Sequence, residues 1–167
     1  MKVFTTRFAF MIMAGLAIAS CKKSTVATPT PAPATTSTTP SFVATVSGTA
    51  YTFTGTAAIP SSGNSVGISG VNMSSYTIMI NDLNPVVGTV AMNMTSGVQG
   101  SITQISTSKQ WSTGLDNTHT GTLTLTTFDR TKKTCSGTFS FSALESPGTG
   151  SSSITITNGS FSNIKWN

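Results

Sequence analysis

The sequence predicts an all-β domain, an antiparallel β-sandwich or β-barrel of about eight to ten short strands. Apolar and polar residues alternate with a period of two from residue 41 onward, as in half-buried strands. Clusters of Gly, Pro, Asn and Ser interrupt this alternation at intervals of roughly 10–15 residues. Ser and Thr make up 57 of the 167 residues, and β-branched Thr suits a pleated strand with one face in water.

Each alternating run places its apolar residues on one face. These residues are Tyr51 and Phe53; Val66 and Ile68; Tyr76, Ile78 and Ile80; Val90, Met92 and Met94; Leu123 and Leu125; Phe139 and Phe141; and Ile154 and Ile156. We expect them to form the core together with Phe161, Ile164 and Trp166. A domain of this size buries about two-thirds of its unfolded surface, which is enough for one core without disulfides.

Turn signals separate the runs. They are Ser47-Gly48, residues 60–64, Asn84-Pro85, Ser96-Gly97, residues 147–150 and Asn158-Gly159. Asn-Gly is the strongest hairpin dipeptide, so Asn158-Gly159 predicts a tight turn between two strands. The basic run Arg130-Thr131-Lys132-Lys133 lies between two strong strands and predicts a hairpin tip with solvated charges.

The net charge of +5 belongs to the N-terminal region rather than to the β domain. Only 8% of the residues are charged, and the sequence pI is about 9.6. Residues 41–167 contain five Lys or Arg against four Asp or Glu, which leaves a net charge of +1. No aromatic residues are interleaved with the basic run at 130–133. A nucleic-acid partner is therefore not expected.

Residues 1–20 have the pattern of a lipoprotein signal peptide. Lys2 and Arg7 precede an apolar run of about eleven residues, too short for the roughly 20 residues that span a membrane. The segment Ile18-Ala19-Ser20-Cys21 resembles the lipobox of bacterial lipoproteins, in which the Cys is acylated and becomes the new N-terminus. We therefore expect cleavage before Cys21, lipidation of Cys21 and anchoring to a membrane.

Residues 21–40 continue as a linker and residues 41–167 as the all-β domain. Pro, Thr, Ser and Ala dominate the linker, so it cannot form a core and we expect it to be disordered. A Pro-rich chain is extended, at about 3.1 Å per residue, which gives the linker a reach of roughly 50–60 Å.

The C-terminal third carries a resemblance. The segments 121–129, 136–143 and 154–161 follow one another, and Phe42-x-Ala44-x-Val46-x-Gly48 fits a first strand. In this order they are similar to a family of small lipoproteins of unknown function from Bacteroidota-type bacteria. The resemblance implies an all-β domain at the outer membrane and no activity. Lys22 and Lys23 stand where surface-exported relatives often carry acidic residues, so the domain could face the periplasm or the cell surface.

Few residues are suited to catalysis or to binding a metal or cofactor, and we expect none of these functions. Cys135 shares the parity of the core residues Phe139 and Phe141, which predicts a buried and unreactive thiol. Asp116 and His119 lie three residues apart and would be the centre of a small hydrolase, the least favoured alternative.

Two further patterns have a structural and a functional interpretation. Met92-x-Met94 places two thioethers on one strand face, either as core packing or as soft ligands for Cu(I). Trp111 and Trp166 are either partly buried or platforms for a sugar ring. Core packing and burial are the favoured interpretations.

The sequence therefore predicts a non-catalytic binding or interaction module, anchored to the outer membrane through lipidated Cys21. Its expected partner is an envelope protein or a glycan. The main alternative is a calycin-like barrel that encloses an apolar ligand among the Met and Phe side chains.

Overall fold

A computed structural model describes residues 39–58, 63–146 and 152–166. Cys21 and the predicted signal peptide lie outside the described residues, as does the predicted linker up to residue 38. The described residues form ten strands: β1 (Ser41–Val46), β2 (Thr49–Ala58), β3 (Val66–Val71), β4 (Tyr76–Asp82), β5 (Gly88–Met92), β6 (Val98–Gln104), β7 (Gln110–Ser112), β8 (Gly121–Asp129), β9 (Thr134–Ser146) and β10 (Ser153–Lys165). The predicted all-β class is confirmed.

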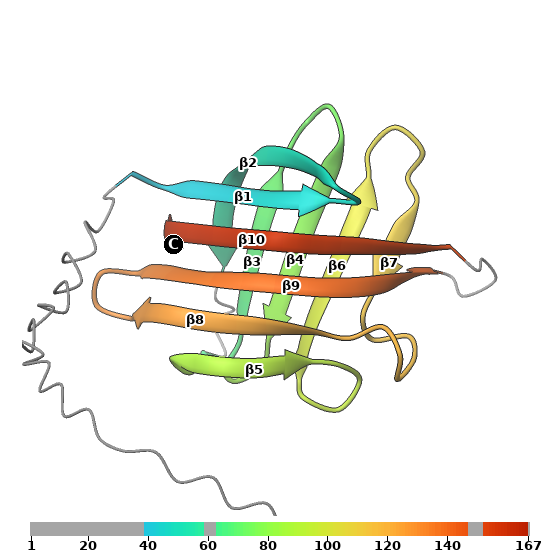
Figure 1. Cartoon of the computed structure of the whole chain (residues 1–167). Helices are drawn as coiled ribbons and strands as arrows, with labels where there is room; N and C mark the ends of the chain where they lie inside the picture. The colour runs from blue at the N-terminus through green and yellow to red at the C-terminus, as the bar shows by residue number, and fades with distance from the viewer. Residues whose placement is uncertain (1–38, 59–62, 147–151, 167) are drawn as a thin grey trace, which may run out of the picture. The chain divides into compact units, whose positions relative to one another are not determined.

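Eight of the strands close into an antiparallel barrel. Their order is β10-β1-β2-β3-β4-β6-β7-β9, and the ring closes because β9 pairs with both β7 and β10. β8 pairs with the N-terminal part of β9, from Thr134 to Phe141, and pairs with β5 along its other edge. In Figure 1, β1, β10, β9, β8 and β5 form a front layer, and β2, β3, β4, β6 and β7 cross behind it.

Aromatic side chains fill the inside of the barrel. The ring of Phe42 is fully buried and lies 5.4 Å from the ring of Phe139 and 6.1 Å from that of Phe161, centroid to centroid. Gly70 makes room for this cluster, because a Cβ there would lie 2.6 Å from Phe42. The predicted apolar faces are buried in or packed against this core, with the exception of Met94.

The prediction of a hairpin turn at Asn158-Gly159 is wrong. Both residues lie inside β10, where Asn158 has φ 50° and the register against β9 shifts between Ile156 and Gly159. This is a β-bulge, and it has a clear cause in the sequence. The buried residues change parity from Ile156 to Phe161, and one extra residue keeps both side chains inside.

Two other predicted turns are confirmed. Ser47 and Gly48 have φ 47° and 87° and connect the paired residues Val46 and Thr49. Two left-handed residues in a two-residue loop are the pattern of a type I′ hairpin. Residues 130–133 form the tip between β8 and β9, whose last ladder pair is Asp129 with Thr134.

The predicted shared face of Met92 and Met94 is also wrong. Met92 is fully buried at the end of β5, whereas Met94 lies in the following loop and is 51% exposed. The strand stops because the side-chain oxygen of Asn93 accepts the N–H groups of Thr95 and Ser96, which folds the chain into a turn. The two thioethers therefore do not form a pair on one strand face.

Candidate functional site: a groove on the outer face of the barrel

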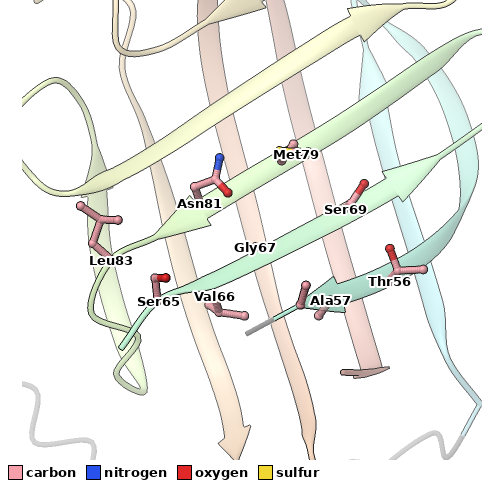
Figure 2. A pocket seen from close by; sticks show the side chains of 10 residues that line it. Thr56, Ala57, Ser65, Val66, Gly67, Ser69, Met79, Asn81 and Leu83 are labelled. Carbon is pink, nitrogen blue, oxygen red and sulfur yellow. The ribbon is translucent and has the colours of Figure 1, made fainter. Parts of the chain in front are cut away.

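A groove of about 410 Å³ follows β3 on the outer face of the barrel, between β2 and β4 (Figure 2). Ten residues line it: Thr56, Ala57 and Ala58 from β2; Ser65, Val66, Gly67 and Ser69 at and along β3; and Met79, Asn81 and Leu83 from β4 and its end. None of these ten residues is charged. The groove is therefore suited to a neutral partner with apolar groups.

The alternation of β3 and β4 produces the groove. On β3, Ile68 is buried in the barrel, and its neighbours Gly67 and Ser69 face outward with little or no side chain. On β4, Ile80 is buried and Met79 faces outward. Short side chains on the middle strand next to longer ones on β4 leave a trough along β3.

The β4 side of the groove exposes apolar side chains. Met79 is 42% exposed and Leu83 is 63% exposed, and Asn81 between them supplies an amide. Val86 and Val87 in the loop after β4 are also exposed, at 69% and 61%, and line a separate hollow. Exposed apolar residues that adjoin a hollow are typical of binding surfaces.

Sequence reasoning missed this groove. It followed the inward parity of each strand and favoured core packing for the methionines, Met79 included, whereas Met79 is 42% exposed. The available signal was the outward parity of Met79 beside Ile78 and Ile80, combined with Gly67 and Ser69 on the neighbouring strand. The pairing of Ser69 with Met79 that brings these residues together comes from the sheet register.

Asp82 lies at the end of β4 with only 3% of its surface exposed. Its carboxylate accepts the N–H of Asn84 over 2.9 Å, which closes a turn after the strand. Burial raises the pKa of Asp82 above its usual range, against the opposing effect of this hydrogen bond. Asp82 also lines a second hollow of about 230 Å³ beneath the loop that connects β4 to β5.

The structure brings Asp116 and His119 together, as the sequence allowed. Nδ1 of His119 lies 2.7 Å from the Oδ2 atom of Asp116. The Asp116 carboxylate also accepts the N–H groups of His119 and Thr118 over 2.7 and 3.0 Å. These hydrogen bonds, led by the backbone N–H of His119, hold the pKa of Asp116 far below its usual range. This set of contacts is that of a rigid turn before β8.

The remaining candidate residues are buried. Burial raises the pKa of the Cys135 thiol to about 12, as expected for an unreactive core cysteine. Trp111 and Trp166 are 7% and 6% exposed, so neither ring presents a face for a sugar. The indole N–H of Trp111 donates to Ser152 over 3.2 Å, and Trp166 stacks on Phe128.

Within residues 39–58, 63–146 and 152–166, no three His, Cys, Asp or Glu side chains gather in a way that could hold a metal ion. The same residues contain no helix long and apolar enough to cross a membrane.

The family model of the domain of unknown function DUF6252 matches residues 38–165. The chain belongs to the DUF6252 family. The matched DUF6252 domain includes every strand of the barrel and all ten residues of the groove. Neither the curated proteins nor the solved structures include one that matches the chain.

Proposed function

We propose that this DUF6252 domain is a non-catalytic binding module of the cell envelope, anchored to the outer membrane through lipidated Cys21. In this proposal the groove along β3 is its contact surface. The groove is the observation that carries the proposal, because it combines a hollow of about 410 Å³ with exposed apolar side chains. Met79 and Leu83 would provide apolar contact, and Asn81 would provide hydrogen bonds.

The groove favours an apolar protein surface over a glycan. Glycan sites commonly use an exposed aromatic ring that stacks on the sugar, since such a ring is apolar and tolerates water. Both Trp rings are buried, and Tyr51 packs edge-on against Tyr76 with 5.4 Å between the ring centroids. The groove itself is lined by aliphatic, Met, Ser, Thr and Asn side chains. These side chains suit an envelope protein with exposed aliphatic residues.

The filled interior favours an outer contact surface over an enclosed ligand. Phe42, Phe139 and Phe161 occupy the centre of the barrel with ring centroids 5.4 to 6.3 Å apart. A calycin-like ligand would need this volume, and core side chains at native packing density leave few voids larger than a water molecule.

The groove is tested by a bulky substitution at Ser69, which faces it from the middle of β3. We expect Ser69→Trp to abolish capture of a specific protein from native envelope by the membrane-anchored chain. Thr103→Trp is the matched control, because Thr103 alternates with buried Ile102 on the outer face of β6 and does not line the groove. Equal capture by both variants and the unmodified chain would contradict the role of the groove.

The anchor is tested separately at Cys21. We expect labelled palmitate to be incorporated into the unmodified chain and not into Cys21→Ser, which should also leave the membrane fraction. Several acyl chains give an effectively permanent anchor, since each buried CH₂ contributes about 0.8 kcal/mol. Palmitate incorporation that is unchanged in Cys21→Ser would refute lipidation at this residue.

A further inference from the structure

The topology gathers four cations at one end of the barrel. β10 ends at Lys165, which pairs with Thr134 at the start of β9. Thr134 in turn pairs with Asp129 at the foot of the hairpin tip that carries Arg130, Lys132 and Lys133. We call Arg130, Lys132, Lys133 and Lys165 the basic end. All four residues are exposed.

The β domain is joined to the N-terminal region at this same end. Ser41 at the start of β1 pairs with Ser162, three residues before Lys165 on β10. Figure 1 shows the start of β1, the end of β10 and the tip between β8 and β9 on the same side of the barrel. The chain therefore enters the β domain at the end that carries the four cations.

The acidic groups lie elsewhere or are already engaged. Among the described residues, Asp129 is the acid at the basic end. Its carboxylate accepts the N–H groups of Thr131 and Lys132 within the turn, and its Oδ2 atom lies 3.6 Å from Nζ of Lys132, so this one cation is partly neutralised. At the opposite end, Glu145 forms an ion pair with Lys109, with 3.0 Å between Oε1 and Nζ. β9 spans the thirteen residues between these ends, a distance of about 40 Å at 3.3 Å per residue. Screening limits each end's field to about 10 Å in 0.1 M salt, so the basic end acts on its own.

The basic end is also held in place. The guanidinium of Arg130 donates to the carbonyl of Gly63 over 3.1 Å and lies 5.1 Å from the centroid of the Phe128 ring. Phe128 stacks on the ring of Trp166. The backbone N–H of Trp166 donates to the backbone carbonyl of Lys133 over 3.2 Å. These contacts fix the backbone of the tip and the position of Arg130, while the side chain of Lys132 remains 79% exposed. A rigid frame lowers the entropy lost when the end binds a surface.

We propose that the basic end binds anionic lipid head groups and so turns this end of the barrel toward the membrane. The proposal rests on the proposed lipid anchor for its setting, because the anchor holds the domain beside a membrane. Each exposed cation near an anionic leaflet strengthens binding about 5-fold. The tether supplies a high local concentration, so a weak surface interaction is sufficient to orient the domain. The groove along β3 would then have a fixed orientation relative to the lipid surface.

The test uses the β domain without its anchor. Residues 35–167 form one compact unit, and the closed barrel holds the core within it. Cosedimentation of residues 38–167 would be measured with vesicles of phosphatidylcholine alone and of phosphatidylcholine mixed with phosphatidylglycerol. We expect binding only to the mixed vesicles, and we expect it to be lost when NaCl is raised from about 0.1 M to about 1 M.

The variant Lys132→Gln/Lys133→Gln removes two cations from the tip and should weaken binding about 25-fold. Lys109→Glu is the matched control, since it also changes the net charge by −2 but acts at the opposite end of β9. We expect the control to bind like the unmodified domain. Equal losses in both variants, or equal binding to neutral vesicles, would overturn the proposal. Neither outcome depends on Cys21, so failure here is distinct from failure of palmitate labelling.

Discussion

The strands β2, β3 and β4 have one face inside the barrel and one face outside it. The two faces use small residues differently. Inside, Phe42 contacts rings from several strands, and glycines such as Gly159 accommodate the rings. Outside, Gly67 and Ser69 leave a trough beside exposed Met79. Inside the barrel, a small residue makes room for a neighbouring ring. On the outer face, a small residue leaves a groove. This difference places stability inside the barrel and the proposed binding function outside it.

The largest expected effect comes from truncating the central ring. Phe42→Ala removes a fully buried side chain and should lower the free energy of unfolding by about 3–5 kcal/mol. Met79→Ala on the groove should change it by less than about 0.5 kcal/mol. Urea unfolding followed by circular dichroism measures both values. Similar losses in the two variants would break the distinction between the inner and outer faces.

Glycine substitutions make the same comparison with the smallest possible change. A Cβ at Gly159 would lie 2.5 Å from the Phe139 ring, so Gly159→Ala should cost about 1–3 kcal/mol through overpacking. A Cβ at Gly67 would meet the side-chain oxygen of Asn81 at 3.3 Å, and Asn81 is exposed and can move. Gly67→Ala should therefore be nearly neutral. Thermal unfolding of both variants would show an inverted order if the groove were part of the packed core.

Asp82 lies at the end of β4, and its buried carboxyl group should make the stability of the folded protein depend on pH. Its pKa is raised in the folded state by burial, so ionisation destabilises the native protein as the pH rises through the carboxyl range. Asp82→Asn removes this cost and keeps an oxygen that can accept the N–H of Asn84. We expect the variant to melt at a higher temperature than the unmodified chain near pH 7. The difference should disappear near pH 3, where the unmodified carboxyl is protonated.

A pH-independent difference between the two proteins would show that the charge of Asp82 is not the cause.

The pKa of Asp116 is shifted in the opposite direction to that of Asp82. Its pKa is lowered in the folded protein, so its hydrogen bonds stabilise the native state at neutral pH. That stabilisation decreases as the pH falls through the folded-state pKa.

Ser69→Trp should also have only a small effect on stability. The new ring would lie in the groove on the outer face and should leave the free energy of unfolding within about 0.5 kcal/mol of the original value. Loss of partner capture with unchanged stability is the combination that separates binding from folding. A large loss of stability would indicate that the trough along β3 belongs to the packed part of the molecule.

The sequence predicted the strands and most of the core because strand alternation is a local signal. Ile78 and Ile80, for example, share a buried face as their spacing predicts. Closure of the barrel was left open between a sandwich and a barrel, because the pairing of β9 with both β7 and β10 is nonlocal. The dipeptide Asn158-Gly159 predicts a turn, whereas the change of parity between Ile156 and Phe161 indicates the bulge that the structure contains.

The groove could not be derived from single strands. Ser69 and Met79 become neighbours only through the register between β3 and β4. The basic end has a similar origin, since Lys165 lies far along the chain from the tip that carries Lys132. The sequence predicted an exposed tip at residues 130–133, and the β9–β10 register places Lys165 beside it. The sequence alone predicts which short segments are exposed or buried. Which distant residues lie side by side follows only from the strand pairing.

Hydrogen–deuterium exchange of the chain with and without its captured envelope partner tests the central claim most directly. We expect added protection in peptides covering residues 65–71 and 76–83, which contain the β3 and β4 parts of the groove. Peptides from β9 and β10, which supply Phe139 and Phe161 to the interior, should be unchanged. Protection confined to β9 and β10, with none along β3 and β4, would contradict the groove as the binding surface.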